Sequence, residues 1–250
     1  METTEKSGGL KPIQPSIDTV QVEVFYAERP ANDPLLGDIL WDNVDESGAL
    51  DHATREIVNR NGFRVGIVGA DPPQALQTLL GLSTESDARN LNGRRIGLFT
   101  GTTTEVQTSP DYETCSISFL DREDSLHEQE FQNARCVLRL KAERFQPGWA
   151  RLEFQPEIHH GENRLRHQAG ENGWQLRTTQ NVKQMFSQTF EVTLNQAEMV
   201  IITQLDDAES SVGRHFFNHG DPPDQKQRIL VVRLGTMNKT VGQRTEPDGD

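Results

Sequence analysis

The sequence predicts an α+β fold, in which a small βααβα unit is followed by a predominantly antiparallel β-sheet or sandwich. Three observations lead to this class. Apolar residues at helical spacing are confined to residues 19–91, where they alternate with two strand patterns. From residue 92 to 236 the apolar residues instead follow a period of two. Turn residues such as Pro110, Gly161 and Asn195 separate these later segments, as is usual in antiparallel sheets and sandwiches.

The N-terminal unit begins with a strand at 19–28, where Val20, Val22 and Val24 alternate with polar residues. Asp33 followed by Pro34 is a typical start of a helix. The other expected elements of the unit are the apolar helix face from Leu36 to Val44, a helix at about 51–61, a strand at 63–68 and a helix that begins at Asp71.

The second part consists of short strands. The clearest hairpin joins 134–145 to 149–158 through the turn at Pro147 and Gly148. Two strands are apolar on both faces and should be central in a sheet, 198–205 and 228–235. The remaining expected strands are 94–99, 103–108, 113–120, 174–179 and 185–194.

This pattern divides the chain into four segments. We expect a flexible leader at 1–18, the α/β unit at 19–91, the β-rich domain at 92–236 and a flexible tail at 237–250. The N-terminus lacks the basic and apolar regions of a signal peptide, which taken literally indicates a cytoplasmic protein. A start that lies further upstream remains open as the alternative.

Charge and hydropathy exclude several classes of partner. Among 250 residues, 38 are acidic and 25 are basic, which gives a net charge of −13. Nucleic acids and anionic lipid surfaces select clustered Lys and Arg, so neither is an expected partner. No apolar run approaches the ~20 residues of a membrane-spanning helix.

Motifs for nucleophilic catalysis and phosphate binding are absent from the sequence. Neither GxSxG nor SxxK occurs. Gly66 and Gly69 precede Asp71 and Pro72, which oppose a bound phosphate, so they predict a tight turn between a strand and a helix. Cys115 and Cys136 share the strand parity of apolar neighbours. We expect both thiols to lie in a core and to be unreactive, with a disulfide as the minor alternative.

Histidines offer the one candidate metal site. His159, His160 and His167 cluster near a predicted turn, while His215 and His219 are spaced i, i+4 with Asp221 nearby. Adjacent residues of a strand point to opposite faces, so His159 and His160 cannot easily share one ion. Solvated loop histidines are therefore expected, with no metal or other cofactor. The acidic stretch 121–130 lacks the DxDxDG ladder of calcium sites and predicts a solvated loop.

Several segments between residues 19 and 235 follow, in order, a pattern known from one protein family. They are VQVEVFYAE with Gly37 and Trp41, Asn92-Gly93, CVLRLKAERFQPGWARLEFQPEI, FEVTLNQAEMVIITQL, SVGRHFF and RILVVRL. Together they resemble the homology domain of secretins, the ring-forming channel proteins of type II and type III secretion systems. In the paired strands, Leu138, Leu140, Leu152 and Pro156 occupy corresponding places.

The resemblance is divergent. Asn195-Gln196 stands where a secretin has a glycine. The region 109–130, where a secretin carries its membrane-inserting hairpin, is short and acidic here. The resemblance therefore implies a β-module that lacks the membrane-inserting hairpin and acts in the cell envelope or periplasm.

The function predicted from these observations is non-enzymatic. We expect a secretin-like module, related to secretion systems, that binds protein partners or itself through exposed edge strands. No catalytic, cofactor-binding or metal-binding residues are assigned, and no direct membrane insertion is expected. Two alternatives remain open: a metal-dependent hydrolase that uses the turn histidines, and a small-ligand binding domain with its pocket between the α/β unit and the β-rich part.

Overall fold

The computed structural model describes residues 17–31, 33–81, 94–170, 173–205, 211–220 and 223–240. The elements, in chain order, are β1 (Ile17–Pro30), η1 (Pro34–Leu36), α1 (Asp38–Trp41), α2 (Glu46–Ala49), α3 (His52–Arg60), β2 (Phe63–Val68), α4 (Gln74–Leu79), β3 (Arg94–Phe99), β4 (Thr103–Gln107), β5 (Tyr112–Leu120), β6 (Leu126–Gln146), β7 (Trp149–Gly170), β8 (Gly173–Gln184), η3 (Phe186–Gln188), β9 (Phe190–Asn195), β10 (Met199–Gln204), α5 (Val212–Phe217), β11 (Asn218–His219) and β12 (Lys226–Thr240).

The first sheet, sheet A, has the strand order β2-β10-β12-β1-β3, with β11 beside β12, and every pairing is antiparallel. All six residues of β10 are buried, because both faces of the sheet are covered. One face packs against the second sheet, and the other is covered by η1, α1 and α4 through residues such as Leu40 and Leu76. The predicted central position of the two strands that are apolar on both faces is therefore confirmed.

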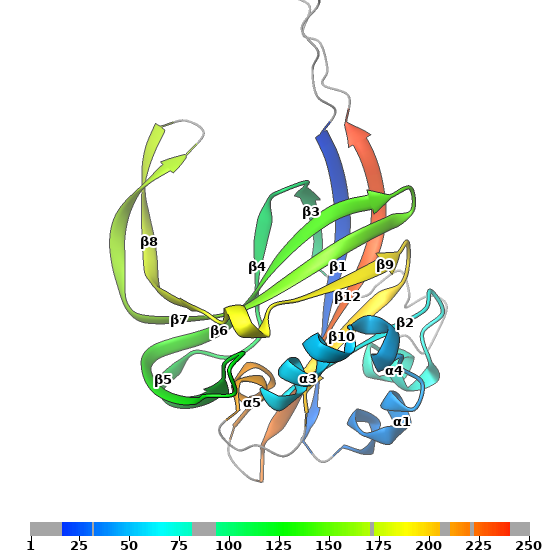
Figure 1. Cartoon of the computed structure of the whole chain (residues 1–250), viewed down its shortest axis with the longest axis horizontal. Coiled ribbons are helices and arrows are strands. Elements are labelled where there is room, and N and C mark those ends of the chain that lie inside the picture. Colours follow the sequence, from blue (N-terminus) through cyan, green and yellow to red (C-terminus); the bar gives the residue numbers. More distant parts are fainter. Residues whose placement is uncertain are drawn as a thin grey trace, which may run out of the picture.

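The second sheet, sheet B, has the strand order β4-β6-β7-β8, with β5 paired to β6 and β9 paired to β7. The predicted hairpin at Pro147-Gly148 is confirmed as β6 and β7, which pair from Gln146↔Trp149 to Arg135↔His159. Both strands continue beyond this pairing. There they separate, β6 toward β5 and β7 toward β8, and the two pairs diverge as arms from the body (Figure 1).

The β-rich α+β class is confirmed. Strands from both sides of the predicted domain boundary share sheet A, since β1 pairs with β12 and β2 with β10. The boundary itself, between residues 91 and 92, lies outside the described residues, as do residues 1–16 of the expected leader and 241–250 of the expected tail.

Several strand predictions need correction. Residues 126–130, expected in a solvated loop, begin β6 because they pair with β5. The segment 185–189 is not the start of a strand but holds the 3-10 turn η3, which leads into β9. The strand expected to end at 235 continues through residue 240, since β1 begins at Ile17 and offers it a partner along its whole length.

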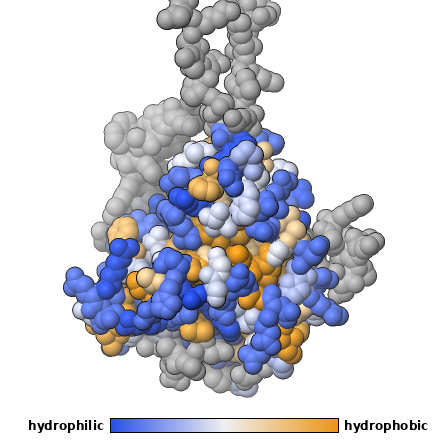
Figure 2. All heavy atoms as spheres, turned by 45° about the vertical axis from the view of Figure 1, so that its right-hand side comes forward, coloured by the Kyte–Doolittle hydropathy of each residue, from blue (hydrophilic) through white to orange (hydrophobic). Residues whose placement is uncertain are grey.

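The surface of the molecule is mixed in polarity. Hydrophilic side chains surround a band of apolar ones on the face shown in Figure 2. No helix in the described part of the chain is long and apolar enough to cross a membrane.

A close backbone contact between α5 and the turn after α3 gives the first testable prediction. Gly213 N–H donates to the Asn61 carbonyl at 2.9 Å, and a Cβ on Gly213 would overlap the Gly62 carbonyl. Backbone atoms cannot move aside cheaply, so Gly213→Ala should lower the free energy of unfolding by about 1–3 kcal/mol. Gly69→Ala is the control, because nothing lies within 4 Å of its added Cβ. Urea unfolding measures both, and equal midpoints for the two variants would contradict this account.

Candidate functional site

The candidate site lies where β6 and β7 separate. Two residues beyond the last pair, Arg135↔His159, stand Asn133 on β6 and Gly161 on β7, with φ of 48° and 81°. Gln180 on β8 donates from Nε2 to the Asn133 carbonyl at 2.9 Å and to the Gly161 carbonyl at 3.1 Å. Because Asn133 and Gly161 have left-handed backbone, β6 and β7 turn away from each other here. The Gln180 side chain bridges the carbonyls of these two residues. We call this place the fork.

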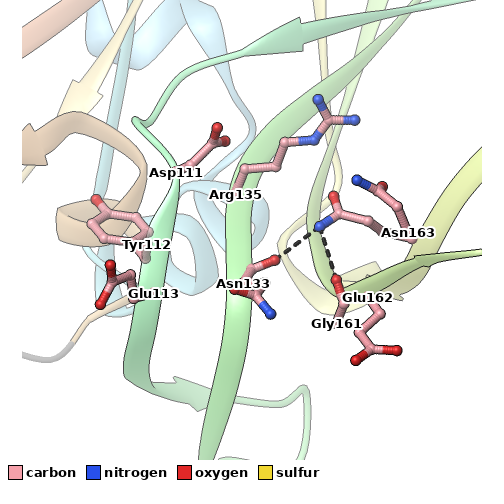
Figure 3. Close-up of a pocket in the computed structure, with 9 residues that line it drawn as sticks. Asp111, Tyr112, Glu113, Asn133, Arg135, Gly161, Glu162 and Asn163 are labelled. Carbon is pink, nitrogen blue, oxygen red and sulfur yellow. Dashed lines mark hydrogen bonds between the residues drawn. The ribbon is translucent and has the colours of Figure 1, made fainter.

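A pocket of about 640 Å³ opens at the fork. Figure 3 shows its lining: Asp111 and two β5 residues on one side, β6 residues between, and β7 residues on the other. The lining residues are Asp111, Tyr112, Glu113, Asn133, Arg135, Gly161, Glu162, Asn163 and Gln180. Three of them are carboxylates and one is a guanidinium. Neither Glu113 nor Glu162 has a cationic partner among the described residues, so the pocket is electronegative.

The strand edge inside the fork is unpaired. Asp121 N–H donates to the Ser125 carbonyl across the β5–β6 turn, and Leu120 directs its backbone N–H and carbonyl to Asn61 instead of to β6. In an antiparallel ladder, hydrogen-bonded and non-hydrogen-bonded pairs alternate. Glu128 and Glu130 therefore point their N–H and carbonyl groups away from β5, into the fork. Within the described residues, no strand pairs with β6 on that side over 126–132.

A buried ionic cluster lies directly beside the fork. Glu157 on β7 has no exposed surface, and its carboxylate lies 2.9–3.0 Å from Nε and Nη2 of Arg139 on β6. His159 Nε2 lies 3.1 Å from Oε2, and Gln184 donates to Oε1 at 3.2 Å. The histidine tautomer with hydrogen on Nε2 leaves Nδ1 as an acceptor toward Arg135 Nη2, 3.5 Å away.

Hydrogen bonds determine the charge state of Glu157. Burial by itself raises the pKa of this carboxyl, but hydrogen bonds from His159, Arg139 and Gln184 outweigh it and hold the pKa below its ordinary value. The carboxylate is therefore ionised near neutral pH. It holds Arg139, and through His159 it positions Arg135 at the wall of the pocket.

The histidines are placed differently from the sequence prediction. His159 is not a solvated loop residue, because it lies within β7 and is buried in the ionic cluster. His160 is in edge contact with the ring of Phe131, with centroids 5.0 Å apart. His215 contacts the Ser211 carbonyl through Nδ1 at 2.9 Å, and His219 lies 3.8 Å from Glu28.

These histidines do not form a metal centre in the described structure. Among the described residues, no group of three or more His, Cys, Asp and Glu side chains could hold a metal ion. Asp221 and the side chain of His167 lie outside the described residues.

The other sequence candidates are packing residues. Cys115 and Cys136 are buried and unbonded, as predicted, and burial raises the pKa of the Cys115 thiol to about 11. Gly66 lies within β2, the strand expected at 63–68, and a Cβ there would overlap the side chain of Val44. The pocket at the fork lies within sheet B, whereas the small-ligand hypothesis expected one between the α/β unit and the β-rich part.

Comparison of the chain with models of protein families, with curated proteins and with solved structures finds no match. The function therefore has to be inferred from the site itself.

Glu157 and Gln180 were not among the residues expected to form a site. Strand parity places Glu157 on the face opposite Phe154 and Ile158, which in a flat sheet faces solvent. Nothing in the sequence signals that this carboxylate lies buried among Arg139, His159 and Gln184.

The ionic cluster predicts a large cost for removing its carboxylate. Glu157→Ala leaves Arg139 without its counter-charge, which should lower the free energy of unfolding by about 3–5 kcal/mol. Glu153→Ala removes a carboxylate from the same face of the same strand, where no described hydrogen bond depends on it, and should change stability by less than about 0.5 kcal/mol. Urea denaturation of both variants measures the difference. A loss of stability for Glu157→Ala as small as that for Glu153→Ala would show that the cluster is not stabilising.

The same cluster predicts a pH dependence. The folded-state pKa of Glu157 lies below the ordinary value of about 4.3, so its contribution is present above that pH and is lost as the pH falls through the folded pKa. Wild-type protein should therefore lose more stability on acidification below about pH 4.3 than Glu157→Gln. Thermal unfolding midpoints across this range measure the effect, and parallel curves would contradict it.

Proposed function

We propose that this protein is a non-enzymatic module for protein–protein interaction, which captures an extended segment of a partner at the edge of β6 inside the fork. The observation that carries the proposal is the unpaired edge at Glu128 and Glu130. Unpaired N–H and carbonyl groups on an edge strand are a template for another strand, and strand addition is a common mode of peptide recognition.

The charge around this edge favours a basic partner. Glu128 and Glu130 are exposed on β6, and Asp111, Glu113 and Glu162 line the adjoining pocket. The whole chain has a net charge of −13. A second copy would bring the same negative charge to the edge, so charge opposes self-association there and favours a segment rich in Lys or Arg.

The arrangement of the site supports binding of an extended segment in particular. The backbone groups of β6 lie in a row that leads to the pocket at the root of the fork. A segment paired with β6 would place side chains alternately on the two faces of the strand. A basic side chain near the pocket would meet carboxylates that lack an ion pair.

The setting of this interaction is part of the proposal. The resemblance to the secretin homology domain favours an assembly of the cell envelope that is related to protein secretion. The hydrolase alternative has little support, because the histidines of the described residues do not converge on one point.

A designed peptide tests the proposal. The probe is a short, end-capped peptide of alternating Lys and Val, and its control carries N-methyl groups on every second residue, which block pairing along one edge. Isothermal titration calorimetry with the full chain should show binding of the first peptide and at least about tenfold weaker binding of the second.

A pair of variants separates backbone pairing from charge. Glu130→Pro removes a fork-facing N–H, which an edge strand tolerates, and Glu130→Gln removes the same charge but keeps the N–H. We expect Glu130→Pro to bind the peptide at least about tenfold more weakly than Glu130→Gln. Equal affinity of the two variants, with unchanged thermal midpoints, would show that charge alone holds the peptide and would reject the edge as the site.

A further inference from the structure

A second pocket, of about 360 Å³, lies beside α5 and β11. Tyr112 lines both this pocket and the one at the fork, while the other lining residues are different. The side chains that matter most here are Arg214 and His215 on α5 and Asn218 on β11. The cavity is large enough for a small organic molecule, at the lower end of the ~300–1,000 Å³ typical of ligand sites.

Asn218 is the most informative residue of this pocket. It is 6% exposed, and its side-chain Oδ1 is buried without a hydrogen-bond partner among the described residues. Its backbone is fully used, since Asn218 pairs with Gln227 and its carbonyl accepts from the Tyr112 hydroxyl at 3.1 Å. An unpaired buried polar group costs stability, so the side chain has no evident role in the fold.

Arg214 is the charged side chain that the argument uses in this pocket. No described residue forms an ion pair or hydrogen bond with the Arg214 guanidinium. Lys226 and Arg228 lie nearby, Glu28 is bonded to Arg228, and the backbone of Asp224 lies against Gly220 at the rim. Among the described residues, Arg214 is therefore a pocket cation without a counter-charge.

His215 adds a hydrogen-bonding group of defined polarity. Its Nδ1 lies 2.9 Å from the Ser211 carbonyl, which can only accept, so Nδ1 carries the hydrogen. Burial lowers the pKa of this ring, which is consequently neutral near pH 7, and its Nε2 is an acceptor. The ring is also held by edge contact with Tyr112, with centroids 6.0 Å apart.

We propose that this pocket binds a small anion, either a carboxylate or a phosphate, that also carries two hydroxyl groups. Arg214 pairs with the anionic group, and a guanidinium suits the two oxygens of a carboxylate or phosphate. One hydroxyl donates its hydrogen to Asn218 Oδ1 and the other donates to His215 Nε2, because both atoms are acceptors. This site is independent of strand addition at the fork, and neither proposal needs the other.

Calorimetry on the full chain tests the site. The probes are D-glycerate and sn-glycerol 3-phosphate, which separate the carboxylate from the phosphate, and the controls are glycerol and inorganic phosphate. We expect at least one hydroxylated anion to bind in the millimolar range or tighter, about tenfold more tightly than inorganic phosphate, and glycerol not to bind. Absence of binding by both probes, or equal affinity for inorganic phosphate, would overturn the proposal.

Variants assign the roles of the residues. Arg214→Gln should weaken binding at least about tenfold, whereas Arg122→Gln, which removes one exposed positive charge from the β5–β6 turn, should leave it unchanged. Asn218→Ala should weaken binding while the thermal midpoint of the ligand-free protein stays the same or rises, because an unpaired buried group is removed. A marked fall in that midpoint would assign the carboxamide to the fold, and unchanged binding by Arg214→Gln would equally refute the site.

Discussion

The separation of β6 from β7 is the constraint on which the rest of sheet B depends. Up to Arg135 and His159 each strand is the neighbour of the other, and beyond that point each has a different partner. Left-handed backbone at Asn133 and Gly161 allows the change, and Gln180 satisfies both released carbonyls. Glu157 holds the two strands together at their last shared positions through Arg139. The pocket and the open edge thus have one origin.

Local patterns in the sequence were sufficient for the elements whose partners are close in the chain. The β6–β7 hairpin could be predicted because Pro147-Gly148 stands between two alternating runs that face each other across a short turn. The interior position of β10 and β12 followed from strands that are apolar on both faces. Pairing of β1 with β12 joins segments some two hundred residues apart. Alternation of apolar residues predicts which face of a strand is buried, but it does not predict which strand lies beside it.

The candidate site was beyond sequence analysis for a related reason. A strand period of two predicts which side of a sheet a residue occupies, but not where the sheet bends enough to bury that side. His159 was expected among solvated loop histidines, whereas it forms a buried ion cluster with Glu157. Gly161 was expected in a turn, whereas it lies inside β7 and marks a change of partner. Asn218 illustrates the same limit, because only its surroundings distinguish an unsatisfied amide from a solvated one.

The pairing of β1 with β12 has a consequence for biosynthesis. During translation β12 leaves the ribosome after every other described strand, so the centre of sheet A stays incomplete until then. Val22 and Val24 of β1 would meanwhile lack their final neighbours, Leu234 and Val232. The β6–β7 hairpin can form early, because its two strands are consecutive in the chain and its contacts are local. Local pairing therefore favours early formation of this hairpin, while β1 waits longest for its partner strand.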